Sequence, residues 1–158
     1  MRYTIDTVTS MIGASRYGYC PATIAWLLTD SRSLCFPDET LFFALQGKRD
    51  GHEYIRGLYD KGVRNFVVSR LPDRMDDYLD SNFLLVKDTL KALQTLSMQH
   101  RREFEIPVIG ITGSNGKTVV KEWLYQLLEQ DYVVTRSPRS YNSQIGVPLS
   151  VWLMNKKT

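Results

Sequence analysis

The sequence predicts an α/β protein in which a small domain precedes the start of a second domain with a mainly parallel sheet. Short apolar segments of strand length alternate with helix-length segments through residues 1–86. An apolar segment over 106–111 then leads into a glycine-rich turn and a further helix, an order typical of parallel sheets. The length of 158 residues suits one ordinary domain or two small ones. We therefore expect domains at 1–86 and 87–158.

The elements expected in the first domain follow one another in short steps. Inward-facing apolar residues predict a helix over Ile5–Ile12, which ends at Gly13. A second helix is expected to begin at Glu53 and to end near Gly62. Segment 71–82 is largely polar and predicts a surface connection with some helix. The predicted strands are 24–28, 41–45, 65–69 and 83–86.

The second domain is expected to open with a longer helix. Asp88 is a suitable N-cap for a helix that ends near Glu103 and has a leucine stripe. Segment 106–111 predicts a buried strand, residues after Thr118 a helix with one apolar face, and 132–135 another strand. The tryptophans stand in apolar patterns and are expected in the core: Trp26, Trp123 and Trp152.

Composition excludes several classes of function. The formal net charge is +3 without a long basic run, which argues against nucleic-acid binding. No apolar run approaches the roughly 20 residues that span a bilayer, and the N-terminus lacks the apolar core of a signal peptide, so a cytoplasmic protein without membrane insertion is expected. Cys20 and Cys35 lack metal-ligand or redox spacing, and His52 and His100 are too far apart to suggest a metal site.

The glycine-rich turn predicts a phosphate-binding site for ATP. Glycines allow the backbone to aim several N–H groups at one point, and the following helix adds its positive N-terminal end. Lys117 can reach the β- and γ-phosphates, and the Thr118 hydroxyl can ligate Mg²⁺. Ile111 stands where the common pattern has its first glycine, so a surface turn with a chance Lys-Thr is the structural alternative. The turn consists of Thr112, Gly113, Ser114, Asn115, Gly116, Lys117 and Thr118.

This turn resembles the phosphate loop of the Mur ligases, the ATP-dependent amino-acid ligases of peptidoglycan synthesis, in which the departure at Ile111 is expected. A second set of motifs matches independently: Asp30-Ser31-Arg32, the run 41–47 and Asp50-Gly51-His52 resemble the uridine-nucleotide-binding domain of the two later ligases. The resemblance implies a uridine-nucleotide-binding domain followed by the start of a P-loop ATPase domain. It implies ATP binding by 112–118, catalytic roles for Lys117 and Thr118, and Mg²⁺ at Thr118. The implied substrate-binding residues are Ser31, Arg32, Gly47, Asp50, Gly51, His52 and Asn142.

The run 141–150 distinguishes between those two ligases. It is similar to the Asn-x-x-Ile-Gly-Val-Pro-Leu run of the ligase that joins D-alanyl-D-alanine to UDP-N-acetylmuramoyl-tripeptide. The ligase that adds the third residue tends to have a Thr-Thr-Pro segment there, and it remains the alternative within the family. The first domain also resembles the version in which this ligase is fused to an alanine racemase. Outside the family, the candidates are a separate uridine-nucleotide-binding module and an unrelated P-loop kinase or GTPase, although 155–158 lacks the aspartate of the guanine motif.

Several of these residues could instead have purely structural roles. Ser31 could be an ordinary turn serine, and Arg32 could pair with an aspartate to fix its loop. Asp50 could cap the next helix, and Asn142 could be a structural loop residue. Because no strand-end acid for Mg²⁺ follows the turn, we expect only the opening part of the ATPase domain and no ligation by these residues alone. The expected partners are the UDP-linked tripeptide and D-alanyl-D-alanine, bound by a monomer.

Overall fold

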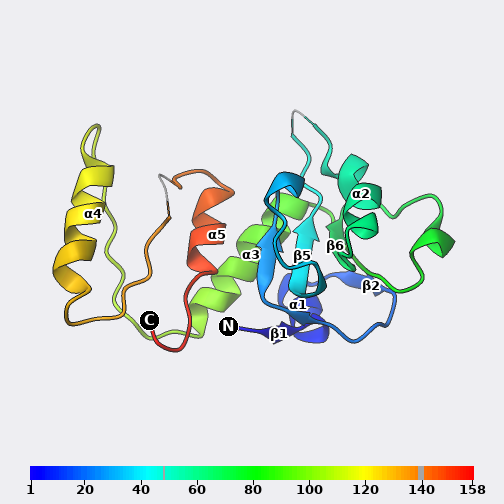
Figure 1. Cartoon of the computed structure of the whole chain (residues 1–158), viewed down its shortest axis with the longest axis horizontal. Helices are drawn as coiled ribbons and strands as arrows, with labels where there is room; N and C mark the ends of the chain where they lie inside the picture. Colours follow the sequence, from blue (N-terminus) through cyan, green and yellow to red (C-terminus); the bar gives the residue numbers. More distant parts are fainter. Residues whose placement is uncertain (48, 139–140) are drawn as a thin grey trace. The chain divides into compact units, whose positions relative to one another are not determined.

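The computed structural model describes residues 1–47, 49–138 and 141–158. Across those residues the chain divides into two compact units (Figure 1): the N-terminal unit, Arg2–Leu96, and the C-terminal unit, Ser97–Thr158, with which Met1 groups. The division falls within helix α3 (Thr89–Arg102). A domain boundary near residue 86 remains a prediction.

A five-stranded sheet with the order β2-β7-β6-β5-β4 organises the N-terminal unit. Strands β4 to β7 pair in parallel, and β2 pairs with β7 antiparallel at the edge. Since parallel strands bring their carboxyl ends to one edge, the loops after β4, β5 and β6 emerge together. The bounds are β2 (Ser15–Tyr17), β4 (Trp26–Leu28), β5 (Thr40–Phe43), β6 (Asn65–Val68) and β7 (Asn82–Leu85).

Aromatic side chains in register form the centre of this unit. Phe66 pairs across the sheet with Phe42 and with Phe83, and its ring stacks on Phe83 with the centroids 5.1 Å apart. Helix α2 (Ile55–Asp60) adds Ile55 and Leu58 to the same buried cluster. Complete burial of one such side chain contributes about 1.5–3 kcal/mol.

Most of the predicted elements of the N-terminal unit are confirmed. Helix α1 (Ile5–Ile12) ends at Gly13, whose φ of 62° is left-handed. The predicted strand 24–28 is two strands, because β3 (Thr23–Ile24) pairs with β1 (Tyr3–Thr4) in a separate sheet and β4 pairs with β5. Strands β1 and β2 were not predicted, since each is too short to show alternation. The 3₁₀ turns are η1 (Ser31–Ser33), η2 (Pro37–Glu39), η3 (Gly51–Tyr54) and η4 (Met75–Tyr78).

The C-terminal unit consists of helices and irregular segments, and no strand occurs among its described residues. Its helices are the end of α3, α4 (Lys117–Leu128) and α5 (Gly146–Val151). A small buried cluster joins α3 to the segment after α5: the His100 ring packs on Trp152 and donates from Nε2 to the Met154 carbonyl oxygen, 3.1 Å away. Ser97 Oγ donates to the Pro148 carbonyl oxygen at 3.0 Å.

The structure corrects two groups of expectations. The strands predicted at 106–111 and 132–135 are not formed, because a parallel strand needs neighbours and the described part of this unit supplies none. Trp152 is in the core as expected, but Trp123 is 62% exposed on α4, and Trp26 is 45% exposed with its ring stacked on Phe36. Within the described residues, no helix is long and apolar enough to cross a membrane.

Candidate functional site

The glycine-rich turn leads directly into helix α4. Gly116 is the N-cap of that helix with a left-handed φ of 78°, and no side chain caps the first turn. Gly113 also has a positive φ, 141°. The first turn contains no acidic residue, and the residues of the turn from 112 to 116 are exposed to solvent. This uncapped, positively polarised helix end suits an anion.

Lys117 lies across the turn. Its ammonium group donates to the Gly113 carbonyl oxygen and is 3.4 Å from that of Ser114. Thr118 is exposed in the first turn of the same helix. The lysine, the backbone N–H groups and the threonine hydroxyl are a donor set that fits a Mg²⁺-bound triphosphate, since Mg²⁺ takes few protein ligands and keeps phosphate and water oxygens. Among the described residues, no group of three or more His, Cys, Asp or Glu side chains could hold a metal alone.

The loop after β4 is fixed by its own charges. Asp30 accepts a hydrogen bond from the Arg32 backbone N–H at 3.0 Å, and its other oxygen lies 2.6 Å from the Arg32 guanidinium. These contacts lower the pKa of Asp30 to about 2. The Arg32 side chain is 87% exposed. The Asp30–Arg32 pair fixes the conformation of the loop in which Ser31 begins the 3₁₀ turn η1.

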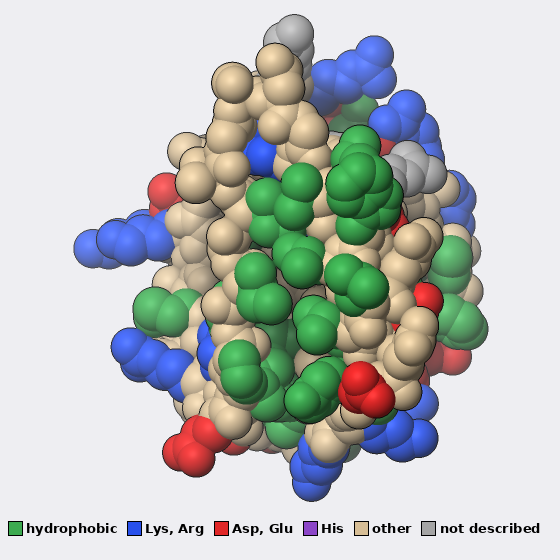
Figure 2. Space-filling view, turned by 90° about the vertical axis from the view of Figure 1, so that its left-hand side faces the viewer, with side chains coloured by type: hydrophobic (Ala, Val, Ile, Leu, Met, Phe, Trp, Pro, Cys, Tyr) green, Lys and Arg blue, Asp and Glu red, His purple; other side chains and the backbone are tan. Residues whose placement is uncertain are grey.

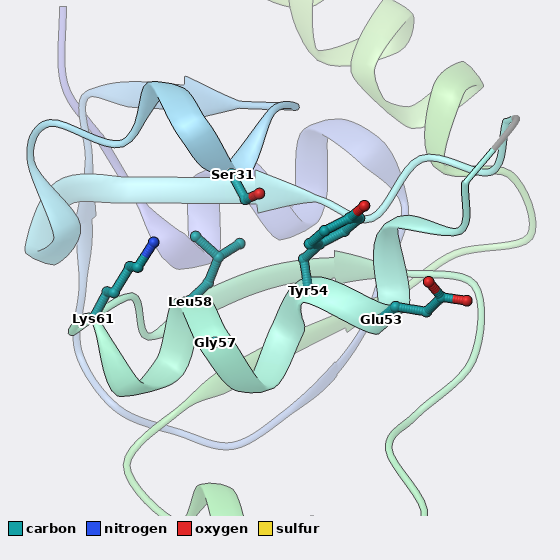
Figure 3. A pocket seen from close by; sticks show the side chains of 6 residues that line it. All are labelled: Ser31, Glu53, Tyr54, Gly57, Leu58 and Lys61. Carbon is teal, nitrogen blue, oxygen red and sulfur yellow. The ribbon is translucent and has the colours of Figure 1, made fainter.

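Ser31 lines a cavity of about 130 Å³ between this loop and α2. In Figure 3 the Ser31 hydroxyl lies above Leu58, with the Tyr54 ring on one side and the Lys61 ammonium group on the other. A hydroxyl, a phenol and an ammonium group around an apolar floor suit a small ligand rich in acceptors. Tyr54 and Lys61 were not predicted as site residues. The signal in the sequence is their position, three residues after Gly51 and directly before Gly62.

A partly buried network joins the loop after β5 to the end of β6. His52 Nδ1 lies 2.6 Å from an Asp50 oxygen, and Nε2 accepts from the Ser69 backbone N–H at 3.0 Å. The His52 side chain is 6% exposed. The His52 backbone N–H and the Arg70 guanidinium also donate to Asp50, and together these bonds hold the pKa of that carboxyl well below its usual range. Both ring nitrogens of His52 are therefore engaged inside the protein.

Gly51 is required by close packing in this loop. A Cβ at this position would lie 2.7 Å from the Ala44 carbonyl carbon and from the Leu45 nitrogen. The Gly51 N–H also donates to the Leu45 carbonyl oxygen at 2.8 Å. Gly47, by contrast, is exposed with open space around it, and residue 48 of the predicted loop lies outside the described residues.

Asn142 belongs to the C-terminal unit, as the glycine-rich turn does. It is exposed and precedes Ser143, whose hydroxyl oxygen accepts from the Gly146 N–H at 2.9 Å at the start of α5. Gly146 is also required, because a Cβ there would lie 2.8 Å from that of Tyr141. The structure thus groups Ser31, Asp50 and His52 in the N-terminal unit, and it leaves their contact with substrate a prediction.

Comparisons with known proteins agree with these two sets of motifs. The model of the Mur ligase middle domain matches residues 111–158. The UDP-N-acetylmuramoyl-tripeptide–D-alanyl-D-alanine ligase of Bacillus subtilis is 32% identical over all of this chain, which covers 34% of that protein. The Escherichia coli enzyme of the same name is 32% identical over 94% of this chain, which covers 31% of it. The chain belongs to the Mur ligase family.

The matched part of a solved Mur ligase has a closely similar backbone. The structure of UDP-N-acetylmuramoylalanyl-D-glutamyl-2,6-diaminopimelate–D-alanyl-D-alanyl ligase from Acinetobacter baumannii superimposes with a TM-score of 0.89 at 26% identity. The match covers 99% of this chain and 34% of that one. The present chain therefore spans about a third of the length of the Mur ligases that it matches. The α/β fold predicted from the sequence is confirmed, whereas the racemase fusion remains a prediction.

Proposed function

We propose that this chain is the uridine-nucleotide-binding part and the opening ATP-binding part of a ligase that joins D-alanyl-D-alanine to UDP-N-acetylmuramoyl-tripeptide. The observation that carries the proposal is the pairing of two site types in one chain. Ser31, in the loop after β4, lines a cavity together with Tyr54 and Lys61, and the glycine-rich turn precedes α4. The two named relatives with that activity match nearly the whole chain.

The N-terminal unit would hold the uridine end of the long substrate. Ser31 would donate to the nucleotide, and Lys61, on the same cavity, would face its phosphates. Asp50 and His52 would act by fixing the loop that contains Gly47, since their polar atoms already bind Ser69 and Arg70. Binding energy far from the reacting carboxylate orients that carboxylate and so contributes to the rate.

The phosphate turn would act on ATP. Lys117 and the first-turn N–H groups of α4 would neutralise charge on the γ-phosphoryl group as the peptide carboxylate takes it. Mg²⁺, held at Thr118, would supply further neutralisation of the phosphate oxygens. The amine of D-alanyl-D-alanine would then displace phosphate. Asn142 would contact substrate or phosphate, and the cytoplasm is the location that fits these nucleotide substrates.

The ligase that adds the third peptide residue is the second candidate. The UDP-N-acetylmuramoyl-L-alanyl-D-glutamate–2,6-diaminopimelate ligase of Clostridium tetani is 33% identical over 64% of this chain. The run around Asn142 to Ser150 favours the first candidate.

The test is titration of the chain with UDP-N-acetylmuramoyl-tripeptide, with UDP and Mg-ATP for comparison. We expect the UDP-peptide to bind, and Ser31→Ala to weaken that binding by about tenfold. Ser33→Ala is the matched control, because Ser33 lies in the same 3₁₀ turn but not on the cavity. ATP binding without a response to any uridine nucleotide would contradict the proposal. We also expect no ligation by the 158 residues alone, and formation of the UDP-pentapeptide would refute that expectation.

A further inference from the structure

Arg70 follows β6 by two residues, at the edge of the sheet where the loops after β4 and β5 also emerge. Its guanidinium donates from Nη2 to an Asp50 oxygen 2.5 Å away, and its side chain is 56% exposed. A guanidinium has five N–H groups in one plane. Within the part of the chain that the structure describes, Asp50 is the one partner of this side chain, so most of its N–H groups can still meet a ligand.

The anchor of Arg70 is held in place by other bonds. Asp50 is the N-cap of η3, and one of its oxygens accepts from the His52 backbone N–H at 3.0 Å and lies 2.6 Å from His52 Nδ1. The other ring nitrogen of His52 accepts from the Ser69 N–H. The loop is therefore closed without the arginine. The ion pair instead fixes where the guanidinium lies, which lowers the entropy cost of binding an anion there.

Exposure alone does not mark a binding residue, because Figure 2 shows Lys and Arg side chains around the margin of the face that it views. The two arginines that flank β6 differ in their contacts. At the amino end, Arg64 donates to Asp80 and to the carbonyl oxygens of Tyr59 and Val63. Its guanidinium carbon also lies 4.2 Å from the centre of the Tyr59 ring. Arg64 is thus occupied inside the protein, whereas Arg70 at the carboxyl end is held by Asp50 and otherwise faces solvent.

We propose that Arg70 binds an anionic group of the uridine-nucleotide substrate, through phosphate or carboxylate oxygens, and that Asp50 orients it. The inference rests on the proposed function, which supplies the substrate. Open parallel sheets bind ligands at the carboxyl edge of their strands. Neighbouring strands lie about 4.8 Å apart, so β6 ends roughly 10 Å from β4, whose loop contains Ser31. A UDP-linked peptide that binds at Ser31 is long enough to place a charged group at that distance.

The chemistry of the side chain fits this role. A guanidinium stays charged over the whole physiological pH range, and its planar fork matches two oxygens of a phosphate or a carboxylate. The loop after β4 repeats the arrangement, because Arg32 is held by Asp30 and is also exposed. Two arginines anchored by aspartates therefore stand at the same edge of the sheet, after β4 and after β6.

The experiment is calorimetric titration of the full chain and its Arg70→Gln variant with UDP-N-acetylmuramoyl-tripeptide, UDP and uridine. We expect Arg70→Gln to weaken binding of the UDP-peptide by about tenfold and to leave binding of uridine, which has no anionic group, unchanged. Arg56→Gln is the matched control. Arg56 is 59% exposed and also pairs with an aspartate, Asp60, but it lies on α2 beside the Tyr78 ring. This variant should bind all three ligands as the unchanged chain does.

The positioning role of Asp50 has a separate readout. Asp50→Asn keeps a side chain that can cap η3 but removes the charge that holds Arg70. It should weaken binding of the UDP-peptide by about threefold in the unchanged chain and have little further effect beside Arg70→Gln. An equal loss in both backgrounds would show that Asp50 does not act through Arg70 and would overturn this part of the proposal.

The three ligands separate the outcomes for Arg70→Gln. Weaker binding of both UDP and the UDP-peptide, with uridine unchanged, assigns Arg70 to the diphosphate. Weaker binding of the UDP-peptide alone assigns it to a carboxylate of the peptide, and either result supports the proposal. Unchanged affinities overturn it, as does an equal loss for uridine, which would indicate a purely structural role. If the unchanged chain binds no uridine nucleotide, the proposed function itself fails, and this inference fails with it.

Discussion

The N-terminal and C-terminal units contain similar apolar sequence patterns but end in different states. Segments 41–45 and 65–69 become strands β5 and β6 with every residue of each strand buried. Segment 106–111 is as apolar, yet it forms no strand and leaves Val108 and Ile109 in solvent. The difference teaches that an apolar segment becomes a parallel strand only where a neighbouring strand is present to complete its hydrogen bonds.

The largest effect on the free energy of unfolding is expected from removing one aromatic side chain in each unit. Phe66→Ala removes the ring at the centre of the sheet, which is 0% exposed, and should lower the free energy of unfolding by about 3–5 kcal/mol. Trp123→Ala removes a ring that is 62% exposed and should change the free energy of unfolding by less than about 0.5 kcal/mol. Urea unfolding measures both. Equal losses would contradict the contrast between the units.

A smaller effect on stability is expected when alanine replaces Gly51, and Gly47 in the same loop provides the comparison. Gly51→Ala places a methyl group against the backbone of Ala44 and Leu45 and should destabilise the N-terminal unit by about 1–3 kcal/mol. Gly47→Ala meets open space and serves as the control. Thermal unfolding gives the measurement. A Gly51→Ala protein as stable as the control would show that the loop does not pack on β5 as described.

The smallest effect is a pH dependence confined to the C-terminal unit. Burial lowers the pKa of His100 below its ordinary value of 6.5, so the folded state binds this proton less readily than the unfolded state. The stabilising contribution is therefore complete above pH 6.5 and declines as the pH falls below it, by at most about 1.4 kcal/mol per pH unit. In the N-terminal unit, the Asp30 side chain has a pKa of about 2, so its contribution to stability is lost only as the pH falls from about 4 to 2.

Urea unfolding at pH 7, 6 and 5, followed by fluorescence in a variant that keeps Trp152 as its one tryptophan, checks this because Trp152 packs on the His100 ring. His100→Gln should flatten the dependence between pH 7 and pH 5. A slope that persists in this variant would show that another group titrates there.

The sequence predicted the features that depend on local residue patterns, and it did not predict the contacts that depend on tertiary pairing. The strands at 41–45, 65–69 and 83–86 were predictable because short continuous apolar runs are local signals. The glycine-rich turn before α4 was predictable from its glycines and Lys-Thr pair, whereas phosphate binding there stays a prediction. The engagement of both His52 nitrogens was not, since Ser69 is brought there by the pairing of β5 with β6. Tyr54 and Lys61 reach the Ser31 cavity through the placement of α2, which is also a tertiary effect.

The most direct test of the contrast between the two units is native-state hydrogen exchange of the whole chain. We predict that amides of β5, β6 and β7 exchange only through global unfolding, because their strands are buried and paired. We predict that amides of α4 exchange through local opening with a much lower free energy, because that helix buries no residue. Protection in α4 equal to that of β6 would contradict the account.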